Sequence, residues 1–409
     1  MLKCRYCGEN KFQVFLDLGK TPLANSYLDK VSLNQIEIFY PLCTYLCKNC
    51  FLIQLQEYET PKNIFSNYAY FSSYSDSWLQ HAKTYTEMMI NRFKLNSKNK
   101  IVEIASNDGY LLQFFKENNF NVLGIEPASN VADVAKKKGI PTITKFFDIK
   151  LAKLLVKEGR KADLIIGNNV LAHVPNLNNF VQGLKILLNS NGIITMEFPH
   201  LLQLIKYNQF DTIYHEHYSY FSFFVVQKIF FSHQLTIFDV DEIPTHGGSL
   251  RIYVTHTNSG NFIISKNVNK LLKKERAFGL KKLKTYKNFS KNAISVKTQL
   301  HNFITNAKNA NKNIVCYGAP AKGNTLLNYC GITSHDIDYT VDKSKFKQGL
   351  FLPGTHIPIK NPEILRETKP DYILILPWNL KDEIIDQLSY IRDWKGKFVV
   401  PIPEVKVYS

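Results

Sequence analysis

The sequence predicts an α/β protein built from three parts: a small metal-binding module, a central open sheet and a second sheet of the same type. Two observations predict this. Two Cys-x-x-Cys pairs lie within the first 50 residues, and strand and helix patterns alternate over residues 100–256 and again from 313 onward. We expect the parts to span residues 1–75, 76–256 and 257–409, because 409 residues exceed one ordinary domain.

Composition limits the classes of function. Hydrophobic residues make up 45% and charged residues 21%, as in ordinary folded proteins. No apolar run reaches the roughly 18 residues of a membrane span, and no secretory signal pattern is visible, so we expect a cytoplasmic protein without membrane contact. A net charge of +17 raises the question of nucleic-acid binding. The lysines are scattered and no RNA-binding signature accompanies them, so a nucleic-acid partner is not expected.

The N-terminal cysteines predict a structural zinc site. Cys4, Cys7, Cys47 and Cys50 form two pairs with the spacing of zinc knuckles. Disulfides do not suit a cytoplasmic chain, and a redox motif would need only one pair. Four thiolates leave no open position on a tetrahedral ion, so we expect the zinc to hold a small domain together.

An aromatic run follows the cysteines. Its rings are Phe65, Tyr68, Tyr70, Phe71, Tyr74 and Trp78, interleaved with serines. Two interpretations stay open: a linker that packs its rings on the next domain, or a lid whose tyrosine hydroxyls reach a neighbouring site. A helix is expected from about residue 78 to 93.

The βαβ unit at residues 101–126 predicts a ligand site. Its first strand ends in a Ser-Asn-Asp-Gly turn, where a ligand can approach the backbone and the next helix. Gly109 is the only glycine of the turn, and Asn107 and Asp108 offer acceptors, so the dinucleotide fingerprint is absent. Such a turn suits a ligand with an amine and a ribose but no phosphate, S-adenosylmethionine (SAM). Glu126, which ends the second strand, could accept the ribose hydroxyls; an ordinary turn without ligand is the alternative.

The rest of the central part completes a sheet. Further strands are expected near 141–144, 163–167, 192–198, 235–241 and 248–255, the last two as a hairpin. This order suits a class I SAM methyltransferase (Rossmann-like) sheet, in which an antiparallel strand closes the edge. Asn168 and His173 follow the strand at 163–167, and polar residues there point into the cleft of an open α/β sheet. A capping or core role for His173 is the alternative.

The run with the most potentially catalytic side chains is Tyr214-His215-Glu216-His217-Tyr218. Its spacing does not match the His-Glu-x-x-His zinc motif. In an extended segment Tyr214 and Glu216 would point one way and His217 the other, unless a turn breaks the alternation. Histidine beside a carboxylate and a phenol can act as a general base; a polar cluster that ties loops together is the alternative.

The C-terminal part predicts a Rossmann-like α/β domain. Lysine-rich surface helices are expected over 257–310, and strands near 313–317, 338–341, 372–376 and 397–400. Pro320 stands where a dinucleotide fingerprint needs its middle glycine, which disfavours that ligand. Backbone amides of residues 318–324, with Lys322, could instead receive the phosphates of a nucleotide-linked substrate.

Five motifs together give the chain a resemblance to a known family. They are the paired Cys-x-x-Cys, Glu-Ile-Ala-Ser-Asn-Asp-Gly-Tyr-Leu-Leu at 103–112, Asn-Val-Leu-Ala-His-Val-Pro at 169–175, Tyr-His-Glu-His-Tyr at 214–218 and Gly-Ala-Pro-Ala-Lys-Gly at 318–323. Over essentially its full length the chain resembles the SAM-dependent sugar C-methyltransferases, which act on nucleotide-linked keto-deoxysugars.

The resemblance implies roles for particular residues. The residues that would hold SAM are Glu103, Ser106, Asn107, Gly109 and Glu126, with Asn168 beside them in the cleft. The residues that would line the sugar pocket are Tyr68, His173, Tyr214, Glu216 and His217. His217 would remove the proton next to the sugar ketone, and Tyr214 or His173 would stabilise the enolate oxygen.

Alternatives remain at this point. They are a sugar O-methyltransferase, an RNA methyltransferase, and a non-catalytic protein that binds zinc and a nucleotide sugar. A monomer is expected. The sequence leaves open which sugar, which carbon and which nucleotide are used.

Overall fold

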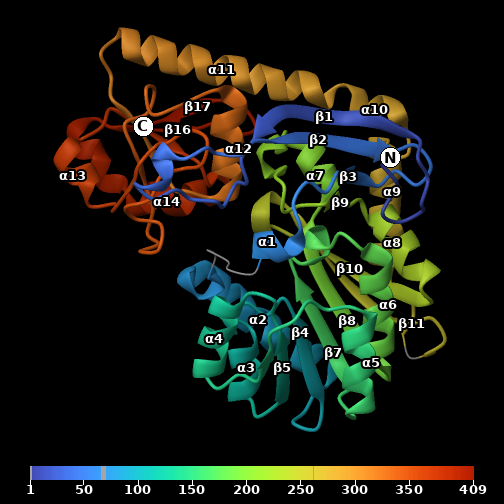
Figure 1. The fold of residues 1–409 in the computed structure, drawn as a ribbon. Coiled ribbons are helices and arrows are strands. Elements are labelled where there is room, and N and C mark those ends of the chain that lie inside the picture. The colour runs from blue at the N-terminus through green and yellow to red at the C-terminus, as the bar shows by residue number, and fades with distance from the viewer. Residues whose placement is uncertain (1, 66–70, 261) are drawn as a thin grey trace.

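The computed structural model describes residues 2–65, 71–260 and 262–409. Three sheets, of four, seven and six strands, form the framework. Figure 1 shows the seven-stranded sheet below, with the N-terminal and C-terminal sheets side by side above it. No helix among the described residues is both long and apolar enough to cross a membrane.

The four-stranded sheet contains the cysteine module. Its order is β1 (Phe12–Thr21), β2 (Tyr40–Cys47), β3 (Ile53–Leu55) and β9 (Ser219–Tyr220), all antiparallel. The fourth strand comes from the central part of the chain and directly follows the Tyr-His-Glu-His-Tyr run. The N-terminal sheet is therefore completed by the segment that carries the predicted base.

The seven-stranded sheet contains all seven strands expected from the sequence, in the order β10-β11-β8-β7-β4-β5-β6. Its strands are β4 (Lys100–Ile104), β5 (Asn121–Ile125), β6 (Thr142–Ile143), β7 (Ala162–Asn168), β8 (Leu188–Pro199), β10 (Leu235–Ile243) and β11 (Ser249–His256). β6, β5, β4, β7 and β8 are parallel neighbours. The carboxyl ends of β4, β5 and β7 therefore meet at one edge, where ligands of such sheets bind.

The antiparallel strand is not at the edge, contrary to the expectation. β11 lies inside the sheet, antiparallel to both β8 and β10. The physical reason is the crossover through α8 (Phe223–Ser232), which carries the chain from β8 past one strand position to β10. The hairpin then folds β11 back into the gap, where both of its sides are hydrogen-bonded.

Helix α2 (Asp76–Phe93) leads into the sheet. Ser75 caps it by accepting a hydrogen bond from the Trp78 N–H (3.3 Å). Its buried side chains recur at helical spacing, which gives one apolar face: they are Trp78, Ala82, Tyr85 and Met89. That face packs on sheet residues of the same cluster, such as Ile101 and Ile166, and this packing places Trp78 near the carboxyl ends of the strands.

Further helices connect the strands of the central sheet. They are α3 (Leu112–Glu117), α4 (Ser129–Lys137), α5 (Ile149–Lys157), α6 (Leu177–Leu187) and α7 (Leu201–Lys206), with α1 (Pro61–Phe65) in the preceding connection. Most follow strands directly, as the alternating sequence pattern predicts.

The C-terminal part begins with the lysine-rich helices α9 (Lys266–Phe278), α10 (Leu283–Lys287) and α11 (Phe289–Asn309). In Figure 1, α11 runs across the top of both upper sheets. The six-stranded sheet has the order β14 (Ile359–Lys360), β13 (Thr340–Val341), β12 (Ile314–Tyr317), β15 (Tyr372–Ile375), β16 (Lys397–Val400) and β17 (Lys406–Tyr408). Its helices are α12 (Ala321–Cys330), α13 (Ile364–Thr368) and α14 (Lys381–Gln387). The short strands β14 and β17 were not predicted.

Hydrogen bonds join the three parts near α12. The Tyr27 hydroxyl donates to the Ala319 carbonyl (2.6 Å), and the Asn324 amide donates to the Ala24 carbonyl (2.6 Å). Thr325 Oγ1 donates to the carbonyl of Ile213 (3.1 Å). α12 therefore packs between the N-terminal module and the segment that precedes the predicted base.

Candidate functional site

A cavity of about 740 Å³ lies at the carboxyl ends of β4, β5 and β7. All three parts of the chain line it: Asn25 from the N-terminal module, Asn107, Glu126, Asn168, His173, Tyr214 and His217 from the central part, and Lys322 from α12. A site of this size, enclosed between domains, is typical of small-molecule binding.

The turn after β4 is held by Glu126. One carboxylate oxygen accepts the N–H of Asn107 (2.9 Å), and the other accepts the N–H of Ala128 (2.9 Å). Burial raises the pKa of Glu126 to about 7, although these two backbone donors oppose the shift. Glu126 therefore fixes the turn and also presents its remaining lone pairs beside the cavity.

Gly109 is required by the turn itself. Its φ is +77°, and a Cβ there would lie 2.3 Å from Cδ1 of Ile140. Its N–H donates to the Ser106 carbonyl (3.0 Å). Glu103, Ser106 and Gly109 do not line the cavity. They lie in or beneath the turn, whereas Asn107, Glu126 and Asn168 line the cavity directly.

Unsatisfied polar atoms around the turn fit SAM. Both side-chain polar atoms of Asn168 are buried without a hydrogen-bond partner, as is Oγ of Ser106. Buried polar atoms normally have partners, so such a group beside a cavity indicates a polar ligand. Burial, above all, raises the pKa of Glu103 well above its ordinary value, and the nearby Glu126 and Asp108 carboxylates add to this. A cation near Glu103 would stabilise the charged form of this carboxylate, and the amine and sulfonium of SAM supply positive charge.

The Tyr-His-Glu-His-Tyr run forms a turn. The His217 N–H donates to the Tyr214 carbonyl (2.9 Å). The rings of Tyr214 and His217 lie 4.0 Å apart between centroids, and those of His173 and His217 lie 4.7 Å apart at 71°. The extended alternation considered for this run is therefore wrong, because the turn brings Tyr214 and His217 to the same face.

The protonation of His217 follows from its contacts. Its Nδ1 lies 2.9 Å from the carbonyl oxygen of Thr212, which can only accept, so Nδ1 carries the hydrogen. Burial lowers the pKa of His217 well below the ordinary histidine value, and the neighbouring His173 and His246 lower it further. His217 is therefore neutral at pH 7, with the lone pair of Nε2 available to a ligand.

Glu216 does not orient the predicted base. Its Oε1 accepts a hydrogen bond from the Asn25 amide (2.6 Å), whereas the partner of His217 Nδ1 is a backbone carbonyl. The suggestion that this carboxylate raises the basicity of the imidazole is therefore not supported at His217. Burial lowers the pKa of His173 to about 4, and a hydrogen bond with the backbone of Glu216 opposes the shift.

Tyr68 lies outside the described residues. On either side of it, Phe65 packs edge-to-face on His173 (5.4 Å), and the N–H of Ser72 donates to Oδ1 of Asn107 (2.9 Å). Phe71 stacks on Phe346 of the C-terminal part (5.0 Å between centroids). The end of the aromatic run thus joins the turn after β4 to the C-terminal part.

His246 is a cavity residue that sequence reasoning missed. It lies at the tip of the β10–β11 hairpin with a φ of +54°, and its Nε2 accepts a hydrogen bond from the Asn169 amide (2.8 Å). Its ring lies 5.2 Å from that of Trp78, which also lines the cavity. The sequence did contain a signal for His246. β10 runs parallel to β8, so the loop that follows β10 must lie at the same edge of the sheet as the carboxyl end of β8.

The four N-terminal cysteines fit a zinc ion. Their Sγ atoms all lie within 4.8 Å of one another, and Gly8 follows the first pair with a φ of +73°. Arg5, inside that pair, donates to the carbonyls of Leu55 and Pro175 (2.9 Å each). This connects the knuckle to the loop that carries His173. A tetrahedral four-thiolate set is a structural type of zinc site.

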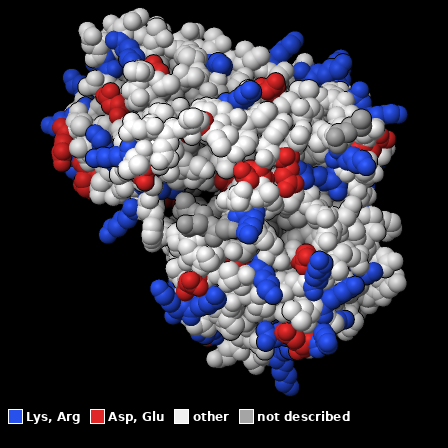
Figure 2. All heavy atoms as spheres, viewed as in Figure 1, with Lys and Arg blue, Asp and Glu red and all other residues white. Residues whose placement is uncertain are grey.

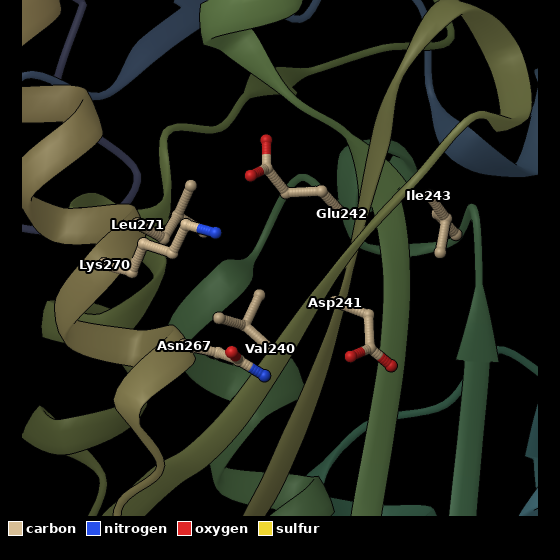
Figure 3. Close-up of a pocket in the computed structure, with 7 residues that line it drawn as sticks. All are labelled: Val240, Asp241, Glu242, Ile243, Asn267, Lys270 and Leu271. Atoms are coloured by element: carbon tan, nitrogen blue, oxygen red, sulfur yellow. The ribbon is translucent and has the colours of Figure 1, made fainter.

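A second hollow, of about 400 Å³, lies between β10 and α9. Figure 3 shows the carboxylates of Asp241 and Glu242 pointing in different directions. Glu242 is paired with Lys274, and none of the residues predicted for the site lines this hollow. It therefore lies apart from the predicted site.

Comparisons with known proteins identify three family models along the chain. Family models match at residues 4–65 (a zinc binding domain), 78–237 (a methyltransferase domain) and 244–403 (a C-methyltransferase C-terminal domain). The curated protein "C-methyltransferase NovU" from Streptomyces niveus is 34% identical over 407 residues, which cover 100% of this chain and 97% of that protein.

Solved structures are more distant. A magnesium protoporphyrin IX methyltransferase from Synechocystis PCC 6803 with bound SAM is 15% identical, covers 44% of this chain and 79% of its own, and has a TM-score of 0.34. The PH0226 protein from Pyrococcus horikoshii OT3 is 13% identical, covers 49% and 99%, and has a TM-score of 0.36. At these TM-scores neither likeness bears on the function.

Proposed function

The chain belongs to the SAM-dependent C-methyltransferases, and from this we propose that it methylates the carbon next to the ketone of a nucleotide-linked keto-deoxysugar. The observation that carries the proposal is the neutral His217 on the cavity wall, with Nδ1 bonded to a backbone carbonyl and Nε2 left for a proton. A carbon next to a ketone is acidic enough for such a base, because the charge spreads onto the oxygen.

The chain's own residues carry the proton steps. His217 Nε2 takes the α-proton, the C–H electron pair becomes a C=C bond, and the carbonyl electron pair moves to oxygen. Tyr214 or His173 stabilises that oxygen by hydrogen bonding. Bound SAM supplies the methyl group to the enolate carbon, with the electron pair of the broken bond remaining on sulfur. Asn107, Glu126 and Asn168 would hold SAM from the cavity wall, and Glu103, Ser106 and Gly109 would support the turn behind it.

The nucleotide carrier is proposed to bind beside α12. Pro320 and Ala321, at the start of this helix, line the cavity together with Lys347. A helix N-terminus offers free N–H groups and a partial positive charge to phosphate. These features favour a substrate that carries a diphosphate over an unmodified sugar.

Mass spectrometry would test the proposal. Purified protein is incubated with SAM and dTDP-, GDP- and CDP-linked 4-keto-6-deoxysugars, in water and in deuterated water. We expect a gain of one methyl group on carbon, with deuterium entering the α-carbon of unreacted sugar. Methyl transfer without α-carbon exchange would instead indicate O-methylation. Neither reaction across the panel, with SAM binding intact, would contradict the proposed substrate class.

A further inference from the structure

Lys322 is a cation on the cavity wall for which the proposed mechanism has no role, and the inference below rests on the proposed function. It lies in the first turn of α12, is half-buried and lines the cavity. Its ammonium donates a hydrogen bond to Oδ1 of Asn379 and lies 4.1 Å from the centroid of the Trp378 ring. These two contacts fix the position of the charge.

The ammonium of Lys322 retains hydrogen-bonding capacity. Of its three N–H groups, the bond to Asn379 uses one. In the described ranges no carboxylate lies within 4.0 Å of Nζ, although Asp211 is near enough to act through its field. Burial lowers the pKa of Lys322 to about 8, and Asp211 opposes the shift. A charge in such surroundings interacts strongly with any anion that forms beside it.

Lys322 and His217 belong to neighbouring walls of the cavity. Asp211, whose Oδ2 accepts the indole N–H of Trp378 (2.6 Å), directly precedes Thr212, whose carbonyl binds His217. Thr325, one helical turn beyond Lys322, holds the carbonyl of Ile213. The segment 211–213 thus contacts both the surroundings of the lysine and the predicted base.

His246 is linked electrostatically to both Lys322 and His217. Burial is the main cause of the lowered pKa values of His246 and His217; the charge of Lys322 adds to the shift of His246, and His173 and His246 add to that of His217. Both histidines and Lys322 line the one cavity. The walls that carry His217 and Lys322 therefore face one binding space.

We propose that Lys322 is a catalytic residue that donates a hydrogen bond to the ketone oxygen, together with Tyr214 or His173, while His217 removes the α-proton. The C–H electron pair forms the C=C bond, and the carbonyl pair moves to oxygen. Lys322 keeps its proton and balances the new negative charge. When the carbon is methylated, the electron pair returns to the C=O bond, and His217 releases its proton to water. A preformed donor aimed at developing charge is the largest contribution in many such reactions.

This assignment differs from the phosphate role considered from the sequence. Lys347 is the candidate for phosphate: it also lines the cavity, and its Nζ is bonded to the Ala319 carbonyl (2.8 Å) at the start of α12 and lies 3.9 Å from Oδ2 of Asp342. The two lysines therefore have different predicted partners.

The test compares Lys322→Met with Lys347→Met in the full-length protein. Four quantities are measured: α-carbon deuterium exchange at saturating keto-sugar, methylation rate, affinity for free dTDP and affinity for SAM. For Lys322→Met we expect exchange and methylation to fall together, about 10²–10³-fold, with dTDP affinity and SAM affinity unchanged. For Lys347→Met we expect weaker dTDP binding, whereas α-carbon exchange at saturating keto-sugar should be retained.

Two results would overturn the role of Lys322. One is exchange within a few-fold of wild type in Lys322→Met; the other is weakened dTDP binding with full exchange at saturation, which would make Lys322 a phosphate ligand. Wild-type protein that exchanges no sugar in the panel would contradict the proposed function itself, so the two failures are distinct.

Asp211→Asn provides a measurement that does not depend on the folding of Lys322→Met. The Asp211 carboxylate raises the pKa of Lys322, so its removal lowers that pKa below about 8. Exchange requires the charged ammonium and is lost as pH rises through this pKa. The alkaline limb of the exchange profile should therefore move to lower pH. An unmoved limb in Asp211→Asn would contradict the proposal.

Discussion

His217 depends on one backbone carbonyl for its chemistry. The Thr212 carbonyl holds the hydrogen on Nδ1 and directs the lone pair of Nε2 away from it. Burial then keeps the ring neutral. A residue that must accept a proton needs both features, because an imidazolium has no lone pair.

His217→Asn should lower α-carbon exchange and methylation by about 10²–10⁴-fold, the usual contribution of a general base. His215→Asn is the matched control, since His215 belongs to the same turn but lies against the carbonyl of Pro41 (3.2 Å) and does not line the cavity. Equal losses in both variants, or an unchanged rate in His217→Asn, would rule out His217 as the base.

The pH profile follows from the same contacts. Because the pKa of His217 lies well below the ordinary histidine value, the active neutral form persists as pH falls through 6.5. We expect kcat/KM to stay level through that range and to fall only in more acidic solution. A steep loss centred near pH 6.5, measured with stopped assays at constant ionic strength, would argue against this environment.

Among the elements, the short helix Ser72–Tyr74 connects the turn after β4 to the C-terminal part. Ser72 is bonded to Asn107, and the rings of Phe71 and Tyr74 lie against Phe346. The two interpretations of the aromatic run, as a linker or as a lid, both remain predictions. The contact with Asn107 means that any movement of this helix reaches the proposed SAM site.

Phe346→Ala tests the lid interpretation. If the ring contact keeps the helix closed, we expect a several-fold rise in the KM for SAM with an unchanged melting temperature, because the 56% exposed Phe346 adds little to the core. Phe231→Ala, which removes a 66% exposed phenylalanine elsewhere, is the control. A KM that matches the control would favour the linker.

The four-stranded sheet connects the zinc site to the turn that carries His217. β3 pairs with β9, and the N–H of Leu55 donates to the Tyr218 carbonyl (3.0 Å). The predicted zinc ligands lie before β1, at the end of β2 and just after β2, so we expect metal binding to stabilise this sheet directly.

Cys47→Ser should therefore release zinc, lower the melting temperature and reduce methylation. Cys43→Ser changes a buried cysteine of the same strand outside the cluster, and we expect it to retain one zinc per chain. Metal content by plasma mass spectrometry and melting curves would measure both. One zinc per chain in purified Cys47→Ser would show that this thiolate is not a ligand.

At the scale of the whole molecule, the site exists only where the three parts meet. The N-terminal module contributes Asn25, which binds Glu216 (2.6 Å), and Tyr27, which binds Ala319. The net positive charge plays no comparable part: Figure 2 shows lysine and arginine spread over the visible face and mixed with acidic residues, without one continuous stripe.

Asn25→Ala tests the contribution of the N-terminal module. A hydrogen bond to a charged group contributes about 1.5–3 kcal/mol, so we expect a measurable loss of unfolding free energy. We also expect a lower kcat/KM for the sugar with an unchanged Kd for SAM. Asn10→Ala, at an exposed position of the same module, should change neither. A loss confined to SAM binding would contradict this placement of the sugar.

The sequence by itself determined the features that depend on near neighbours. The two cysteine pairs, the βαβ turn at residues 101–126 and the order of strand and helix patterns are all local. The cysteine cluster and the seven strands of the central sheet appear as expected, although the antiparallel strand does not lie at the edge. His173, Tyr214 and His217 were also selected from local motifs, although only the structure brings the three rings together.

The tertiary structure decided what depends on contacts between distant residues. The insertion of β11, the pairing of β9 with β3, and the positions of His246 and Lys322 in one cavity follow from packing between segments far apart in the chain. The turn at 214–217 is held by its own hydrogen bond. The orientation of the His217 ring, however, depends on its bond to the Thr212 carbonyl, and the neighbouring Ile213 carbonyl is bonded to α12. Residue spacing specifies a helix or a strand, but the partners of a buried charge are known only once the surrounding surfaces have packed.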